Sequence, residues 1–395
     1  MNINDFHSEI QKLLPVKRNT KDFRIDLSSV LTKYLQMIKS LDADIVLSIE
    51  NWSDTFERID KLIGGIKDAV KHYYEGAHGS AFNVLKNQMI GYGKTIKGVI
   101  DIIELYSVNQ GDCFYRGRLF ENNRHKSYKD MFHIPLDKRG IIKTQRYSTP
   151  GYPCLYLGST IFACWEELGQ PKFDDLMISA FQATRDFKLF DLRTPKKEEF
   201  YSEKLDKLLL RLPLILACSF VIKDDDKSAD FKPEYIIPQL LIEVIINKNR
   251  GKHKKRDVTS FVLGVIFTST HTNEDFLFPT RVFDNIAIPA LDVSSSKGYC
   301  NILSECFKLT DPKCYEYEEL KEDFGINMRK FGLEPKAELE QNYELSKMGK
   351  LERRVNGYEF YQFNYIVVSP VEITLSAEGT PVKVSVRSNI DWKIE

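Results

Sequence analysis

Three short segments of the sequence combine residue types that can bind anions and stabilise developing charge. They are residues 114–118 (FYRGR), residues 145–167, which begin QRYSTPG and end ACWEE, and residues 264–270 (GVIFTST). An arginine guanidinium is a planar fork that can hold phosphate oxygens through two parallel hydrogen bonds. A carboxylate can stabilise positive charge that develops on a neighbouring carbon during bond cleavage. Together these residue types suit a site that holds an anionic substrate and promotes bond cleavage.

The order and spacing of these segments resemble the RES domain family, which is named for its arginine, glutamate and serine. Residues 114–118 are similar to the family's early strand that ends in arginine. Residues 145–167 are similar to its progression of Arg-aromatic, Gly, aliphatic-Tyr and Ala-x-x-Glu. Residues 238–241 (PQLL) and 264–270 are similar to its Gln-Leu helix and its Gly-aliphatic-aromatic-x-Ser strand. The resemblance covers about half of the chain.

The resemblance implies an α+β fold with an ADP-ribosyltransferase-like split β core and flanking helices. It also implies an enzyme that consumes NAD+ by cleaving the nicotinamide–ribose bond, by hydrolysis or phosphorolysis. Such an enzyme would be a bacterial toxin or defence effector, with an antitoxin or immunity protein as its partner. The alternatives are an ADP-ribosyltransferase that acts on a macromolecule and a catalytically inactive RES-like binding module.

The resemblance also assigns roles to individual residues. Arg116 and Arg146 are the candidates that hold the pyrophosphate of NAD+. Glu166 is the candidate catalytic carboxylate, because cleavage of the glycosidic bond develops positive charge on the ribose. Tyr156 is expected to stack on the nicotinamide or to position it. Ser269 is expected to hydrogen-bond the substrate, and Arg116, Tyr156 and Ser269 are candidates for both binding and catalysis.

Several of these choices have close alternatives in the sequence. Arg118 could replace Arg116, because side chains two residues apart share a strand face. Glu166 and Glu167 face about 100° apart on a helix. One of them is therefore expected to point into the site and the other into solvent, and the resemblance favours Glu166. Three other hydroxyl residues compete with Ser269: Ser260, Thr268 and Thr270.

The predicted elements that carry these residues are short strands and helices. Residues 113–116 and 154–158 have the composition of strands, and residues 261–268 that of a buried strand. A helix is predicted to start at Ser159 and to end at Gly169. Residues 237–246 are apolar throughout and could form a helix or a strand.

The regions on either side of this core have different patterns. Residues 22–105 carry apolar residues at helical spacing, with Ser53 as a plausible N-cap. Beyond residue 300, Asn356-Gly357 predicts a β-hairpin turn, and alternating apolar residues in 371–375 and 382–386 predict a second hairpin. We therefore divide the chain into a helical N-terminal domain (1–108), a RES-type catalytic domain (109–300) and a C-terminal extension with β-hairpins (301–395).

Composition restricts the classes of partner. Lys plus Arg and Asp plus Glu both number 56, so the formal net charge is zero and we do not expect nucleic-acid binding. The basic stretch 248–256 (KNRGKHKKR) is interpreted as a solvated loop. No segment approaches the ~20 apolar residues of a membrane-spanning helix, and the N-terminus lacks the apolar run of a signal peptide.

The seven cysteines are scattered and include no Cys-x-x-Cys pair. This pattern is typical of reduced thiols rather than of a zinc site. We therefore expect a cytoplasmic protein that uses NAD+ as a substrate and needs no metal or other cofactor. A homo-oligomer is compatible with the sequence.

Overall fold

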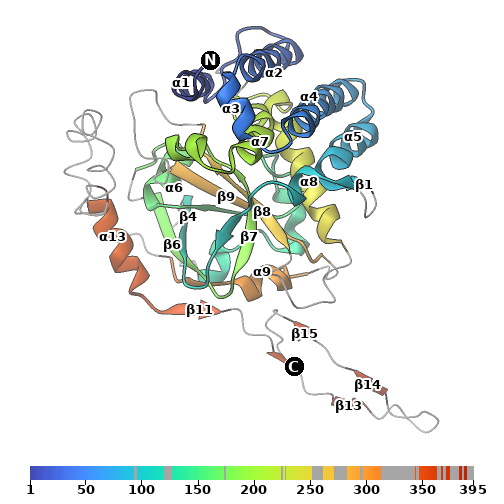
Figure 1. The fold of residues 1–395 in the computed structure, drawn as a ribbon. Helices are drawn as coiled ribbons and strands as arrows, with labels where there is room; N and C mark the ends of the chain where they lie inside the picture. Colours follow the sequence, from blue (N-terminus) through green and yellow to red (C-terminus); the bar gives the residue numbers. More distant parts are fainter. Residues whose placement is uncertain are drawn as a thin grey trace.

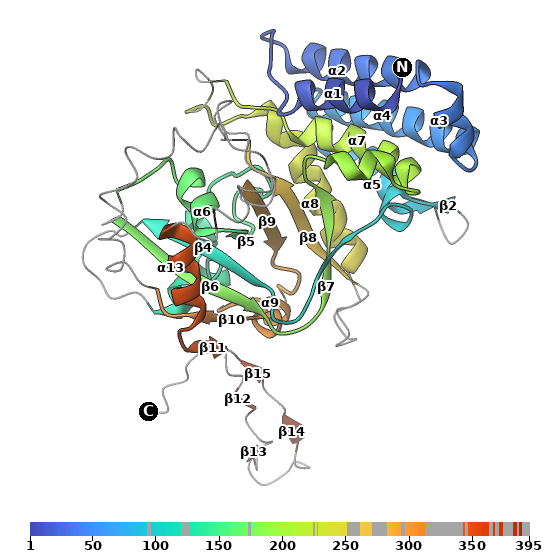
Figure 2. The same cartoon turned by 60° about the vertical axis from the view of Figure 1, so that its left-hand side comes forward.

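The computed structural model shows a nine-stranded sheet packed against helices (Figures 1 and 2). It describes residues 1–92, 96–119, 127–172, 175–223, 226, 228–250, 261–270, 283–293, 297–312, 343 and 347–362, with four short strands between 366 and 388. The sheet order is β11-β10-β6-β4-β5-β9-β8-β7-β3. Every neighbouring pair is antiparallel except the parallel pair β7–β8. The predicted α+β class is thereby confirmed in general terms.

The strands of this sheet come from most of the chain. Their bounds are β3 Tyr106–Val108, β4 Cys113–Leu119, β5 Cys154–Gly158, β6 Leu176–Ala183, β7 Phe187–Leu192, β8 Val262–Thr268, β9 Asp284–Pro289, β10 Phe307–Thr310 and β11 Phe360–Gln362. The strands predicted at 113–116, 154–158 and 261–268 correspond to β4, β5 and β8. The predicted domain boundary at 108/109 falls between β3 and β4, and the predicted boundary at 300/301 precedes β10. Strands of one sheet therefore lie on both sides of each boundary.

The sheet is nearly divided between β4 and β5. Seven residue pairs join β4 to β6 and five join β5 to β9, whereas the single pair Tyr115–Gly158 joins β4 to β5. Beyond this pair the two strands diverge. Residues 116–119 of β4 therefore lie at the border where the two halves of the sheet part.

The helices at the start of the chain pack against two later helices on one side of the sheet. The early helices are α1 Ile3–Leu13, α2 Phe23–Lys39, α3 Ala43–Ser48, α4 Trp52–Tyr74 and α5 His78–Ile90; the later two are α7 Leu205–Cys218 and α8 Ile236–Asn249. One continuous hydrophobic core joins them to the sheet. The buried hydroxyl of Tyr34 in α2 donates to the carbonyl of Leu209 in α7 at 2.6 Å. Residues 237–246 are thus helical, and the N-cap of α4 is Asn51 rather than Ser53.

A second hydrophobic core covers the opposite face of the sheet. It joins Phe114, Phe132, Leu155 and Ile266 to α9 (Asn301–Cys306). Short 3-10 helices complete the connections, at Val99–Asp101, Tyr128–Met131, Leu136–Ile141, Lys197–Tyr201 and Pro233–Tyr235.

The C-terminal part begins with a helix where a hairpin was predicted. Helix α13 (Lys347–Asn356) includes Asn356, so the predicted hairpin turn at Asn356-Gly357 is wrong. At the end of this helix the Gly357 amide donates to the Arg354 carbonyl at 3.0 Å. Asn and Gly favour helix C-termini as well as turns. The second hairpin prediction is confirmed by β13 (Val371–Ile373) pairing with β14 (Val382–Val384). The remaining small strands are β1 Gly91–Tyr92, β2 Ile96–Lys97, β12 Ile366–Val367 and β15 Arg387–Ser388.

Two classes of feature are absent from the described part of the chain. None of its helices combines the length and apolar character needed to cross a membrane. It also contains no group of three or more His, Cys, Asp or Glu side chains arranged to hold a metal ion.

Candidate active site

A carboxylate at the end of helix α6 (Ile161–Glu167) is held by two residues from the sheet. Glu167 accepts hydrogen bonds from the Ser269 hydroxyl at 2.5 Å and from the Asn285 amide at 2.7 Å. Ser269 follows β8 and is buried, Asn285 lies in β9, and Glu167 itself is exposed. The carboxylate is therefore fixed in position by partly buried hydrogen bonds, on a residue that is exposed overall.

The local sequence explains how α6 is positioned. Thr160 caps the helix, since its hydroxyl accepts from the Ala163 amide at 2.9 Å, and Gly169 follows the helix at a positive φ of 77°. The helix thus starts at Ile161 after the Thr160 cap, two residues later than the predicted start at Ser159. The backbone amide of Ser159 instead donates to the Asp284 carbonyl at 2.8 Å, which anchors the start of the turn to β9.

The two adjacent glutamates point to different partners. Glu166 accepts from the Gln170 amide at 3.0 Å, one turn further along the chain, and burial raises the pKa of its carboxyl. Glu167 contacts the predicted Ser269. The structure therefore brings together Ser269 and the alternative glutamate, and it does not bring together Ser269 and the favoured Glu166.

Arg146 is buried close to this cluster. Its guanidinium donates to the carbonyls of Cys218 and Phe220 at 3.1 and 3.0 Å and to the Thr270 hydroxyl at 2.9 Å. The two carbonyls lie at and just beyond the end of α7, where backbone acceptors lack helical partners. Arg146 thus connects the end of α7 to the residue that follows Ser269.

Tyr235 lies between Arg146 and the carboxylate. The Arg146 guanidinium carbon is 5.3 Å from the centre of the Tyr235 ring. Burial raises the pKa of the Tyr235 hydroxyl, the charge of Arg146 lowers it and the charge of Glu167 raises it. Tyr235 was not predicted as a site residue, although it lies two residues before the predicted 237–246 segment.

Tyr156 in β5 has a partner within the protein. Its hydroxyl accepts from the Tyr147 amide at 2.9 Å, and its ring packs against the core shared with the N-terminal helices. Tyr147 in turn contacts Phe267, two residues before Ser269, with ring centres 4.4 Å apart. Tyr156 thereby holds Tyr147 in place, and Tyr147 packs against the strand that leads to Ser269.

Arg116 and Arg118 lie on one face of β4, as predicted for side chains two residues apart. Arg118 donates to the Phe132 carbonyl at 2.9 Å, whereas its Nε atom and the Nη1 atom of Arg116 are buried without hydrogen-bond partners in the described part of the chain. Burial and the charge of Arg118 hold the pKa of Arg116 well below its usual range. The two guanidinium groups are half-buried, and the charge of Asp130 raises the pKa of Arg118 alone, so an anion beside Arg116 would be favourable.

The Arg116–Arg118 pair and the Glu167 cluster lie on opposite faces of the sheet. Phe114 belongs to the core that contains Phe132, and strand alternation places Arg116 and Arg118 on the same face as Phe114. Tyr156 and Phe267 belong to the core on the opposite face, the side from which Glu167 and Arg146 reach Ser269 and Thr270. The arginines of β4 lie where β4 parts from β5 and do not contact the Glu167 cluster.

A buried network of charges was missed by the sequence analysis. Arg193 binds Asp191 through two hydrogen bonds of 3.0 and 2.8 Å and lies 3.6 Å from Asp284, and Arg211 lies 3.2 Å from Asp191. Burial raises the pKa of Asp284 to about 7. Thr268 donates to Asp284 at 3.2 Å and so belongs to this network rather than to the Glu167 cluster. Charged residues inside apolar runs, such as Arg211 in 208–217 (LLLRLPLILA), were the available signal.

A cavity of about 690 Å³ lies on another side of Tyr235. Its charged lining residues are Lys143, Lys232 and Asp230, and Lys232 donates to the Ala229 carbonyl; the aromatic ones are Tyr73, Phe231 and Tyr235. Lysines attract phosphate groups and aromatic rings stack on bases. The cavity therefore has lining groups and a volume that suit part of a nucleotide.

Two features singled out from the sequence, Ser260 and most of the basic stretch 248–256, lie outside the described residues. The described His133 is buried. Its Nε2 atom accepts from the Cys300 amide at 2.9 Å and its Nδ1 atom donates to the Ile134 carbonyl at 2.8 Å, so its ring has a structural role in the core.

Comparison with known proteins identifies one relative of nearly full length. The chain is 30% identical over 366 residues to the "Putative toxin YopC" of Bacillus subtilis (strain 168), and the match covers 86% of this chain and 77% of the relative. No family model matches the chain, and no solved structure is similar to it.

Proposed function

This chain belongs to the family of the putative toxin YopC, and from that premise we propose that it is a toxin that cleaves NAD+ between nicotinamide and ribose. The observation that carries the proposal is the exposed carboxylate of Glu167, fixed by Ser269 and Asn285. The RES resemblance of the segments around Arg116, Arg146, Tyr156 and Ser269 supports the choice of substrate. The near division of the sheet between β4 and β5 supports an ADP-ribosyltransferase-like core.

The proposed reaction uses Glu167 to stabilise positive charge on the ribose. The bond between the ribose carbon and the nicotinamide nitrogen breaks, and its electron pair leaves with the nicotinamide. The ribose becomes an oxocarbenium-like cation, which the Glu167 carboxylate stabilises. Water or phosphate then adds to the same carbon and releases a proton. Ser269 and Asn285 act as positioning residues, because they hold the carboxylate that acts on the substrate.

Two features are proposed as alternative sites for the anionic part of the substrate, because Arg116 and the Glu167 cluster lie on opposite faces of the sheet. Arg116 has a buried Nη1 atom without a partner in the described structure, and a phosphate oxygen would compensate its charge. Lys143 and Lys232 line the cavity beside Tyr235 and would attract phosphate groups. Arg146 is proposed to act indirectly, because its donors already bind carbonyls and a hydroxyl of the protein.

The test is product analysis with two glutamate variants. The full chain is incubated with NAD+, with and without phosphate, and the products are identified by mass spectrometry. We expect Glu167→Gln to reduce nicotinamide release by about 100-fold or more, as for loss of an electrostatic stabiliser. The matched control, Glu166→Gln, should stay within a few-fold of the wild type. Free ADP-ribose indicates hydrolysis, its phosphate ester indicates phosphorolysis, and a labelled macromolecule indicates transfer.

Each outcome bears on a different part of the proposal. Absence of nicotinamide release by the folded wild-type chain would refute NAD+ cleavage. Loss of turnover in Glu166→Gln alone would move the catalytic role to Glu166. Full turnover in both variants would remove this helix end from the mechanism. An antitoxin is part of the proposal, and its signature would be a co-expressed protein that abolishes both toxicity and nicotinamide release.

A further inference from the structure

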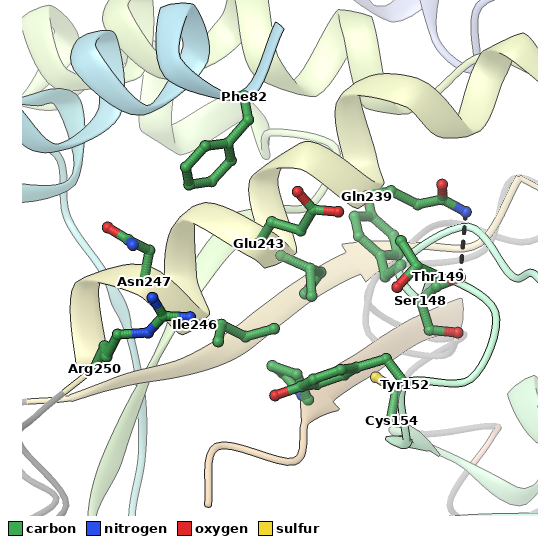
Figure 3. Close-up of a pocket in the computed structure, with 13 residues that line it drawn as sticks. Phe82, Ser148, Thr149, Tyr152, Cys154, Gln239, Glu243, Ile246, Asn247 and Arg250 are labelled. Carbon is green, nitrogen blue, oxygen red and sulfur yellow. Dashed lines mark hydrogen bonds between the residues drawn. The ribbon is translucent and has the colours of Figure 1, made fainter. Parts of the chain in front are cut away.

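A second cavity separates helix α5 from the loop before β5 (Figure 3). Its volume is about 330 Å³. Phe82 of α5 and a face of α8 form one side, and the segment from Tyr147 to Cys154 with Pro289 forms the other. The cavity meets β5 at Cys154, while α6 follows the other end of this strand. It is therefore distinct from the cluster around Glu167.

Three polar residues of α8 lie on the face that lines this cavity. Gln239, Glu243 and Asn247 recur every four residues, and Ile242 and Ile246 lie between them. Residues four apart share a helix face. Most of the other α8 residues are apolar and buried in the core. Packing in the core alone would favour apolar residues on every face of this helix. The three polar residues therefore need another explanation.

The wall opposite α8 is fixed by hydrogen bonds. The Gln239 amide donates to the Thr144 hydroxyl at 2.9 Å and to the Gln145 and Ser148 carbonyls at 2.9 and 3.2 Å. The Tyr152 hydroxyl donates to the Ala290 carbonyl at 2.6 Å. These bonds hold the loop in position, so the cavity is preformed.

Glu243 places a carboxylate in this cavity. Within the described residues, its half-buried carboxylate makes no hydrogen bond or ion pair. Burial raises the pKa of this carboxyl, and the nearby His78 lowers it only in part. Arg250 also lines the cavity, and its guanidinium lies beside Ile246 and makes no ion pair with Glu243 among the described residues. A half-buried carboxylate without a hydrogen-bonded partner is costly, and a cation bound beside it would reduce that cost.

We propose that this cavity binds a small organic molecule that carries an ammonium group on an apolar body. The ammonium lies against Glu243, and the body packs on Phe82, Ile246 and Tyr152. Aromatic rings attract cations through their faces, so Phe82 and Tyr152 favour the same ligand charge as the carboxylate. The volume of the cavity lies at the lower end of the range for small-molecule sites. The site does not depend on the proposed NAD+ reaction.

The test compares three probes that share one body and differ in charge. Phenethylammonium is the cation, 2-phenylethanol is neutral and 3-phenylpropionate is the anion. Binding to the full chain is measured by calorimetry. We expect the cation to bind at least tenfold more tightly than the other two. Glu243→Gln should weaken cation binding at least tenfold, whereas the exposed-site control Glu57→Gln should leave it unchanged.

A second variant separates binding from folding. Asn247→Lys places an ammonium one turn from Glu243, in the favourable Glu-to-Lys order. It should abolish binding of phenethylammonium and leave the unfolding temperature unchanged or raised. Equal binding of the three probes, no binding of the cation at millimolar concentration, or unchanged cation binding in Glu243→Gln would overturn the proposal.

Discussion

Replacement of Arg146 by methionine tests whether this arginine is a structural connection or a substrate clamp. Methionine keeps an unbranched apolar chain but removes all the donors. The carbonyls of Cys218 and Phe220 and the hydroxyl of Thr270 then lose their bonds to a charged group. All three bonds lie in the protein interior, so water cannot readily replace the guanidinium.

The magnitude follows from these lost bonds. Each buried acceptor left unsatisfied costs about 1–3 kcal/mol. Methionine also avoids the cost of burying a charge, which offsets part of the total, so we expect the free energy of unfolding to fall by about 3 kcal/mol. Unfolding entropy of about 2.1 cal/mol/K per residue gives roughly 0.8 kcal/mol/K for 395 residues. The unfolding temperature should therefore fall by about 4 °C.

The assay is thermal unfolding of the two purified proteins in one buffer, with Arg116→Met as the matched control. Arg116 has a buried Nη1 atom without a partner, so its replacement leaves no comparable acceptors unsatisfied and should keep or raise the unfolding temperature. It should instead weaken NAD+ binding. An unchanged unfolding temperature in Arg146→Met, with a drop of several degrees in Arg116→Met, would refute this assignment of the two arginines.

Two further predictions concern stability. Burial raises the pKa of Glu352 from 4.5 to about 7. Between these two pH values the folded protein binds more protons than the unfolded chain. The free energy of unfolding therefore falls as the pH rises through this range. Glu352→Gln should make that fall shallower in urea unfolding at several pH values, and an identical pH profile would contradict the idea. A Cβ on Gly264 would lie 2.2 Å from the Ala287 carbonyl oxygen, whereas one on Gly140 has no atom within 4 Å. Gly264→Ala should therefore lower the midpoint of chemical unfolding strongly and Gly140→Ala should not; equal midpoints would show that β8 and β9 can separate without cost.

Local sequence patterns predicted the elements of the site well. Strand β5 has the predicted bounds 154–158, and α6 ends before Gly169 as its glycine signal indicated. These features depend on propensity and capping, which act over a few residues. The turn prediction at Asn356 failed because an Asn-Gly pair also ends helices, and only the packing of α13 decides between them.

The contacts that define the site could not be predicted in the same way. The choice between Glu166 and Glu167 depends on Ser269, which lies 102 residues from Glu167 in the sequence. The interior partners of Arg146 lie 72 and 74 residues away, at the end of α7. Contacts between residues so far apart produce no local sequence pattern. The resemblance therefore indicated which residue types matter but not which neighbours they contact.

The shared interior of the early helices, α7 and α8 limits how this molecule can be dissected. A version that starts after residue 105 would expose α7 and α8 surfaces that α2, α4 and α5 normally cover, and it would lose the Tyr34 bond to Leu209. Loss of activity in that shortened version would reflect a collapsed fold and would not show whether the early helices restrain the core. Whether these helices restrain the rest of the protein is better asked with single changes at solvent-facing positions such as Ile25 and Leu47, which alter the surface and leave the interior intact.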